Sequence, residues 1–145
     1  MAKRLSETLE MYLKTILILE GEFNPVRTNQ IAKARGVSAA SVTEAVRSLQ
    51  DKGLILHKAY QGVRLSAEGK RLAETILGRY DVLSRFLTNV LGMSATAADR
   101  DACEIEHVVS VETVERLEAF LDHANRGGGM APDEIQRFQE EFNSK

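Results

Sequence analysis

The sequence predicts a mainly α-helical protein with one small β-hairpin in its first half and an all-helical second half. Apolar residues recur at helical spacing through most of the 145 residues. Two short runs rich in β-forming residues, 54–57 and 63–65, flank Tyr60-Gln61-Gly62 and predict the hairpin. Serine and glycine stand at the predicted ends of several helices, where they are favoured as caps. The length fits a small module followed by a helical extension.

The first predicted helix begins after Ser6 and ends near Gly21. Ser6 is a favoured residue type for a helix N-cap. The apolar residues of this stretch fall on one face at helical spacing, which predicts a core-facing stripe of Leu9, Tyr12, Leu13, Ile16 and Leu19. The stretch 22–26, which contains Asn24-Pro25, is predicted to be a loop.

Two short helices and a glycine turn follow. Thr28 is expected to cap a helix that runs to Gly36, and Ser38 to cap a second helix that ends at Lys52-Gly53. The second helix places its apolar residues on one face: Val42, Ala45, Val46 and Leu49. This arrangement predicts a helix-turn-helix, and the hairpin behind it makes it a winged helix-turn-helix.

The polar face of the second helix is the candidate surface for reading DNA in the major groove. Small polar groups there suit base edges, and basic residues nearby suit phosphates. The expected DNA-binding residues are Arg27, Thr28, Ser38, Ala39, Ala40, Ser41, Thr43, Glu44, Arg47, Lys58 and Arg64. Glu44 either accepts a hydrogen bond from a cytosine amino group or packs at the edge. The plainer alternative is that any two short helices joined by a glycine turn share this pattern.

The second half is predicted to be all-helical. A long helix of about residues 67–91 follows Ser66, ends at Gly92 and would carry a dimer interface. Two further helices are expected at about 95–109 and 111–124, then a linker at Gly127–Gly129 and an amphipathic segment at 132–142. The predicted domains are residues 1–72, which form the winged-helix module, and residues 73–145, which form the helical extension.

Charge is distributed unevenly along the chain. Residues 1–72 carry 12 Lys and Arg against 7 Asp and Glu, and residues 73–145 carry 7 against 14. The net charges of +5 and −7 indicate a polyanion such as DNA as partner of the first half, and cations or a protein surface for the second.

Composition excludes several other classes of protein. No apolar run approaches the roughly 20 residues that cross a bilayer, and the N-terminal residues do not resemble a secretory signal. A membrane partner is therefore not expected. The single cysteine, Cys103, excludes an intrachain disulfide and favours a reducing compartment, which predicts a cytoplasmic protein.

Candidate metal ligands cluster near Cys103. Cys103, Glu106 and His107 fall at positions i, i+3 and i+4 of the predicted helix 95–109, so they are expected on one side of it, with Ile105, Val108 and Val109 largely on the core side. Thiolate, carboxylate and imidazole are ingredients of a metal site. Met11 lies off the apolar stripe of the first helix and supplies a thioether. The alternatives are a methionine packed on a second surface and an ordinary buried pair of Cys103 and His107.

Four segments carry a family resemblance. They are Glu10-Met11-Tyr12-Leu13-Lys14-Thr15-Ile16, Val42-Thr43-Glu44, the wing run from Tyr60 to Gly69, and the run from Ala102 to Ser110. Together these segments resemble the diphtheria toxin repressor family, and the match covers nearly all of residues 6–121. The resemblance implies a metal-activated repressor that binds double-stranded operator DNA as a homodimer and has neither catalytic activity nor a small-molecule substrate.

The resemblance also implies a ligand set. The iron-type activating site would use Met11, Cys103, Glu106 and His107, whereas the manganese branch has carboxylates at the positions of Met11, Cys103 and Lys14 and a histidine at that of Tyr80. Sulfur ligands favour Fe²⁺ over Mn²⁺. Co²⁺, Ni²⁺ or Zn²⁺ would serve as surrogates.

Two departures from the family pattern are informative. Tyr80, Ser84 and Asp99 stand where the family's ancillary metal site has a histidine, a glutamate and a histidine, so that site is expected to be missing or rebuilt, with Asp81, Asp99 and Glu104 as acidic neighbours. The chain also stops near the point where iron-type members continue into a C-terminal SH3-like domain, so a two-domain chain without that domain is expected.

Three other functions are compatible with the sequence. The first is a manganese-responsive repressor. The second is a winged-helix regulator that senses no metal, in which Cys103 is either a redox switch or an ordinary core residue. The third is a thiol enzyme with Cys103 and His107 as nucleophile and base, which lacks a recognisable oxyanion-hole loop.

Overall fold

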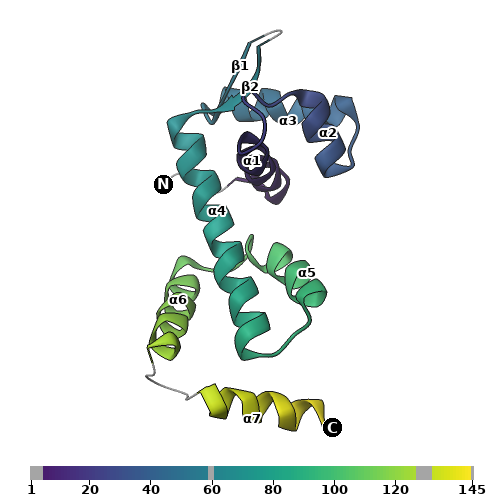
Figure 1. The fold of residues 1–145 in the computed structure, drawn as a ribbon. Coiled ribbons are helices and arrows are strands. Elements are labelled where there is room, and N and C mark those ends of the chain that lie inside the picture. The colour runs from purple at the N-terminus through teal and green to yellow at the C-terminus, as the bar shows by residue number, and fades with distance from the viewer. Residues whose placement is uncertain (1–4, 59–60, 127–131, 145) are drawn as a thin grey trace. The chain divides into compact units, whose positions relative to one another are not determined.

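The computed structural model describes residues 5–58, 61–126 and 132–144. The chain divides into two compact units, Met1–Leu77 and Gly78–Lys145, and the boundary falls within helix α4 (Ala67–Arg85). Figure 1 shows the helices and the single hairpin of these units. The predicted hairpin turn at Tyr60 and the predicted linker Gly127–Gly129 lie outside the described residues.

Helix α1 (Glu7–Glu20) is the centre of the first unit. Its N-cap is Ser6, whose hydroxyl accepts a hydrogen bond from the Leu9 N–H at 3.3 Å, as predicted. Tyr12, Leu13 and Ile16 are buried, and Leu9 and Leu19 pack against the same core. The predicted apolar stripe is therefore confirmed.

Helices α2 (Thr28–Arg35) and α3 (Ala39–Asp51) form the helix-turn-helix around Gly36, which has a φ of +65°. The Ser38 hydroxyl accepts the Ser41 N–H at 3.1 Å, as predicted for a cap. The expectation that Thr28 caps α2 is wrong. Arg27 is the N-cap, because its backbone N–H is held by the Gln30 side chain at 2.8 Å and Thr28 already has helical geometry.

The wing consists of strands β1 (Ile55–Lys58) and β2 (Gly62–Leu65), which pair antiparallel with Ile55 opposite Leu65. Val26, in the loop before α2, pairs with Val63 through two backbone hydrogen bonds of 3.1 and 2.7 Å. Ile55 and Val63 are buried, whereas the alternate residues Leu56 and Arg64 are exposed. One face of the wing thus belongs to the core, and the other face is free to contact a ligand.

Helix α4 starts in close contact with the wing. The Ser66 hydroxyl accepts the Gly69 N–H at 3.0 Å and donates to the Gly53 carbonyl at 2.7 Å, which confirms the predicted cap. A Cβ atom at Gly69 would lie 1.8 Å from the carbonyl oxygen of Leu54. Only glycine permits this approach, so Gly69 sets how closely α4 packs on the chain entering β1.

The second unit contains the end of α4, the π-helical segment η1 (Phe86–Val90), α5 (Ala95–Ile105), α6 (Val111–Asn125) and α7 (Pro132–Asn143). Its core is formed by Val82, Val90 and Leu121, with Phe86 and Phe120 in an edge-to-face contact at 6.1 Å. The expected regular helix to Leu91 is wrong in its last turn. The Thr88 hydroxyl donates to the Ser84 carbonyl at 2.8 Å, and the Leu91 N–H reaches back five residues to Phe86.

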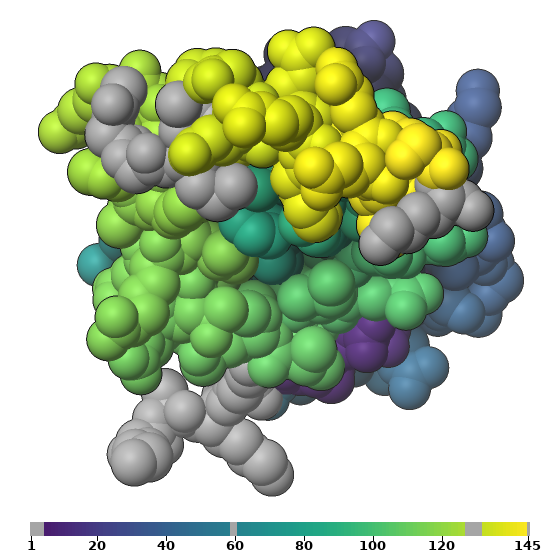
Figure 2. All heavy atoms as spheres, turned by 90° about the horizontal axis from the view of Figure 1, so that it is seen from below, coloured from purple at the N-terminus to yellow at the C-terminus, as the bar shows by residue number. Residues whose placement is uncertain are grey.

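Helix α7 confirms the predicted amphipathic segment, and one edge of it packs against the unit. The Gln139 amide donates to the carbonyls of Asn89 and Val90 at 3.0 and 2.9 Å, and Ile135 is half-buried. Phe138 and Phe142 remain 42% and 67% exposed. Figure 2 shows α7 in yellow next to α6 and over the end of the α4–η1 segment. Among the described residues, no helix is long and apolar enough to cross a membrane.

Candidate DNA interface and metal ligands

Helix α3 separates its residues into a buried and an exposed face. Val42, Ala45, Val46 and Leu49 are buried, as the spacing predicts. Each of the proposed DNA-binding residues is exposed: Arg27, Thr28, Ser38, Ala39, Ala40, Ser41, Thr43, Glu44, Arg47, Lys58 and Arg64. All of these side chains are therefore accessible to a ligand.

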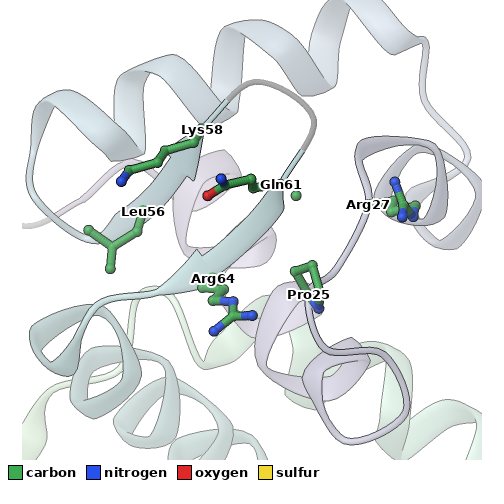
Figure 3. Close-up of a pocket in the computed structure, with 7 residues that line it drawn as sticks. Pro25, Arg27, Leu56, Lys58, Gln61 and Arg64 are labelled. Atoms are coloured by element: carbon green, nitrogen blue, oxygen red, sulfur yellow. The ribbon is translucent and has the colours of Figure 1, made fainter.

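Three cationic side chains surround a groove of about 530 Å³ at the wing. Figure 3 shows Lys58 on β1, Arg64 on β2 and Arg27 at the start of α2, with Pro25, Leu56 and Gln61 along the same groove. Within the described part of the chain, Arg27, Lys58 and Arg64 take part in no ion pair. Cations that are left unpaired around a concave surface suit an anion such as a phosphodiester.

Local polar contacts hold the wing in place. The Glu20 carboxylate accepts the Leu65 N–H at 2.8 Å, and the Gln50 amide donates to the His57 carbonyl at 3.1 Å. A ring nitrogen of His57 lies 3.1 Å from the Gly62 carbonyl across the hairpin. Side chains from α1 and α3 therefore fix both strands. No local pattern of residues indicates the first of these contacts, because Glu20 and Leu65 are 45 residues apart.

The candidate metal ligands do not lie on one continuous helix. Helix α5 ends at Ile105, four residues before its predicted end, and Glu106 is its C-cap. Glu106 and His107 lie in a turn, because Ser110 caps α6 directly afterwards by accepting the Thr113 N–H at 3.2 Å. The expectation that Val108 faces the core is wrong: Val108 is 77% exposed, whereas Glu106 is 0% and His107 6% exposed.

The turn brings the two polar side chains together. Oε1 of Glu106 lies 3.3 Å from Nε2 of His107. Two donor atoms bound to one divalent cation at about 2.1 Å each lie about 3.0–3.4 Å apart in octahedral or tetrahedral geometry. The spacing and the donor types of this pair therefore fit two adjacent ligands of one ion.

The other two candidate ligands are placed differently. Cys103 is half-buried on α5, and Met11 is half-buried on α1 in the first unit. Within the described ranges, no three His, Cys, Asp or Glu side chains are close enough together to hold a metal ion. The structure thus brings Glu106 and His107 together and does not bring Cys103 into one group with them.

Tyr80 and Asp99, which the family resemblance places at the positions of one ancillary site, contact each other directly. The Tyr80 hydroxyl donates a hydrogen bond to the Asp99 carboxylate, which joins α4 to α5. This hydrogen bond, then burial, then the negative charges of Asp99 and Cys103 raise the pKa of Tyr80 to about 12. The phenol is therefore protonated at neutral pH. Nothing in the local sequence indicates a contact between residues on two separate helices.

Comparison with known proteins defines the class. The model of the iron dependent repressor N-terminal DNA binding domain matches residues 4–63, and that of the iron dependent repressor metal binding and dimerisation domain matches residues 66–128. An HTH-type transcriptional regulator of Methanocaldococcus jannaschii is 31% identical over 119 residues, which cover 81% of this chain and 95% of that protein. The fold and these matches define the class: a member of a family of metal-dependent transcriptional repressors, which are DNA-binding proteins and not enzymes.

The chain belongs to the iron-dependent repressor family. It is 31% identical over 125 residues to the diphtheria toxin repressor of Corynebacterium diphtheriae, which covers 86% of this chain and 55% of that protein. A solved manganese-dependent transcriptional repressor in complex with manganese is 32% identical, with a TM-score of 0.72 over 79% of this chain and 52% of that one. The chain therefore spans about half the length of these two relatives. The family resemblance seen in the sequence is confirmed.

Proposed function

We propose that this protein is an Fe²⁺-responsive repressor of metal-homeostasis genes, which binds operator DNA as a homodimer when it is loaded with metal. The observation that carries the proposal is the buried pair of Glu106 and His107, with donor atoms 3.3 Å apart, in a chain that also exposes a recognition helix. Residues 1–72 would bind DNA, and residues 73–145 would bind metal and dimerise. A repressor of this kind acts where the DNA is, in the cytoplasm.

Operator binding would use two sets of contacts, one that reads the bases and one that holds the phosphates. The exposed face of α3, from Ser38 to Arg47, would read base edges in the major groove. Arg27, Lys58 and Arg64 would hold phosphates in the groove beside the wing. Dimerisation places two such modules on one duplex, so the spacing of the two recognition helices decides operator affinity.

The proposed metal ligands are Met11, Cys103, Glu106 and His107. Glu106 and His107 lie at the separation of adjacent ligands, and Cys103 lies on α5, three residues before Glu106 in the sequence. When bound, a divalent cation supplies coordinate bonds that hold these side chains in one arrangement. Because two of the four donors are sulfur atoms, Fe²⁺ is favoured over Mn²⁺.

The metal response follows from where the ligands are in the chain. Met11 belongs to the first unit and the other three ligands to the second, so binding by all four couples the unit that reads DNA to the unit that dimerises. Metal then stabilises whichever arrangement places all four donors together. A coupling free energy of about 1–3 kcal/mol raises operator affinity roughly 5- to 150-fold.

A manganese-responsive repressor is the second candidate. Glu106 and His107 suit Mn²⁺ as well as Fe²⁺, and a solved relative is described as manganese-dependent. The two candidates differ in the role of sulfur. Replacing Cys103 by Asp would lower the affinity for Fe²⁺ relative to Mn²⁺ if the thiolate is a ligand.

The test is anaerobic operator binding with and without metal. A duplex selected from a random library with cobalt-loaded protein serves as the operator, and fluorescence anisotropy gives its affinity. We expect Fe²⁺ or Co²⁺ to raise this affinity within the roughly 5- to 150-fold range and Mn²⁺ to have a smaller effect at equal concentration. Equal affinity with and without any of these ions would remove the metal switch.

A further inference from the structure

Only small side chains of helix α5 are fully buried. Its fully buried residues are Ala98 and Ala102, which allow close packing but offer no large side chain to interlock with a neighbour. Because alanine side chains do not interlock, apolar packing stabilises such a helix but does not strongly fix its rotation about its axis or its position along that axis. A directional contact is needed to fix both.

The hydrogen bond from Tyr80 to Asp99 is a contact of that kind. It joins α4 to α5. The Tyr80 phenol is a rigid ring with one rotatable hydroxyl, so its oxygen lies at a defined distance from the α4 backbone. The carboxylate of Asp99 is thereby held at one position beside α4.

Asp99 and Cys103 share a face of α5. They are four residues apart, so they differ by about 40° around the helix and about 6 Å along it. Each directly follows a buried alanine, Ala98 or Ala102. Cys103 is near enough to Tyr80 for its charge to act on the phenol. Whatever fixes Asp99 against α4 therefore also fixes the direction in which Cys103 points.

We propose that Tyr80 is a positioning residue for metal binding: its hydrogen bond to Asp99 sets the rotation and height of α5 and so holds Cys103 in reach of the ion. This inference rests on the proposed function, in which Cys103 is a ligand. Metal–sulfur bonds have a narrow range of lengths near about 2.3 Å, so a small rotation of α5 moves the thiolate out of range.

The test is a titration of the reduced protein, residues 1–145, with Co²⁺, in which binding is measured by the thiolate-to-cobalt charge-transfer absorption. The Tyr80→Phe variant removes only the hydroxyl. We expect its cobalt affinity to fall about tenfold and its charge-transfer band to weaken, as for other residues that orient metal ligands. The Asp99→Asn variant keeps an oxygen that accepts the Tyr80 hydrogen bond and should retain most of the affinity, whereas Asp99→Ala should match Tyr80→Phe.

Two controls separate positioning from general stabilisation. Thr75→Val removes another hydroxyl from α4, one that donates to the Arg71 carbonyl at 2.9 Å, and should leave cobalt binding unchanged. The double variant Tyr80→Phe with Asp99→Ala should lose no more affinity than either single variant, because both remove the same interaction.

The outcomes are distinguishable. Wild-type affinity and an unchanged band in Tyr80→Phe, even with a lower melting temperature, would overturn the positioning role and leave Cys103 as a ligand. A wild-type protein that binds Co²⁺ without any thiolate band would instead overturn the proposed ligand set.

Discussion

The carboxylate of Glu106 and the imidazole of His107 lie 3.3 Å apart in a turn between α5 and α6, and both side chains are buried. Removing a carboxylate from water costs free energy unless a charged or hydrogen-bonding partner offsets it. Neighbours in sequence rarely face each other on a helix, so this contact depends on the end of α5 at Ile105. The turn therefore brings the two proposed metal ligands together.

Replacing His107 by Ala tests the ligand role of this pair. We expect the metal-dependent gain in operator affinity to disappear, while circular dichroism still reports a helical protein. His123→Ala is the matched control, because His123 is an exposed histidine on α6 and should keep the full response. A normal response in His107→Ala would exclude His107 from the metal site.

The salt dependence of DNA binding tests the groove beside the wing. Each cation that neutralises a phosphate adds about 0.9 to the slope of log affinity against log salt concentration. A homodimer carries two copies of each of these cations, so the triple variant of Arg27, Lys58 and Arg64 to Ala should lower the magnitude of the slope by about 5.4, with nearly equal decreases in affinity on all duplexes. Arg116→Ala, on α6 in the second unit, should leave the slope unchanged. An unchanged slope in the triple variant would show that these cations do not bind phosphate.

Substitution of Gly69 tests how the wing is joined to α4. A methyl group there would collide with the Leu54 carbonyl, so Gly69→Ala should lower the free energy of unfolding by about 1–3 kcal/mol or more. Gly78 on the same helix has open space around it, and Gly78→Ala should be neutral or stabilise by up to about 1 kcal/mol. Chemical denaturation measures both, and equal stability of the two variants would contradict the close packing at Leu54.

The ionisation of Tyr80 has a defined sign. Its pKa is raised to about 12 in the folded protein, so the protonated phenol stabilises the fold. That contribution is complete below the unfolded pKa of about 10 and is lost as the pH rises through about 12. Ultraviolet absorbance of tyrosinate should show Asp99→Asn lowering the pKa of Tyr80 toward about 10, whereas Asp101→Asn should not. Identical titrations of wild type and Asp99→Asn would exclude the carboxylate as the main cause.

Local sequence signals predicted the first unit well. Serine caps at Ser6, Ser38 and Ser66, together with the apolar spacing of α1 and α3, act over three or four residues, so they can be read directly. The N-cap of α2 is Arg27, one residue before the predicted Thr28, and the Gln30 side chain accepts a hydrogen bond from the Arg27 N–H. The proposed DNA-binding residues of α3 are exposed because the opposite face of this helix supplies the core.

The second unit was less predictable, since its features depend on packing between helices. The apolar run Ile105, Val108 and Val109 predicted a continuation of α5, but the cap at Ser110 ends it early and turns Glu106 and His107 inward. The π-helical turn of η1 and the bond between Tyr80 and Asp99 likewise depend on long-range contacts. The residue types of the candidate site were predicted, but their geometry was not.

Anomalous diffraction from crystals of the cobalt-loaded protein tests the central claim most directly. The account predicts one strong cobalt peak per chain, with Nε2 of His107 and Oε1 of Glu106 at about 2.0–2.2 Å and the sulfur atoms of Cys103 and Met11 completing the coordination. A peak bound elsewhere, or a fully loaded crystal whose cobalt contacts neither Glu106 nor His107, would contradict it.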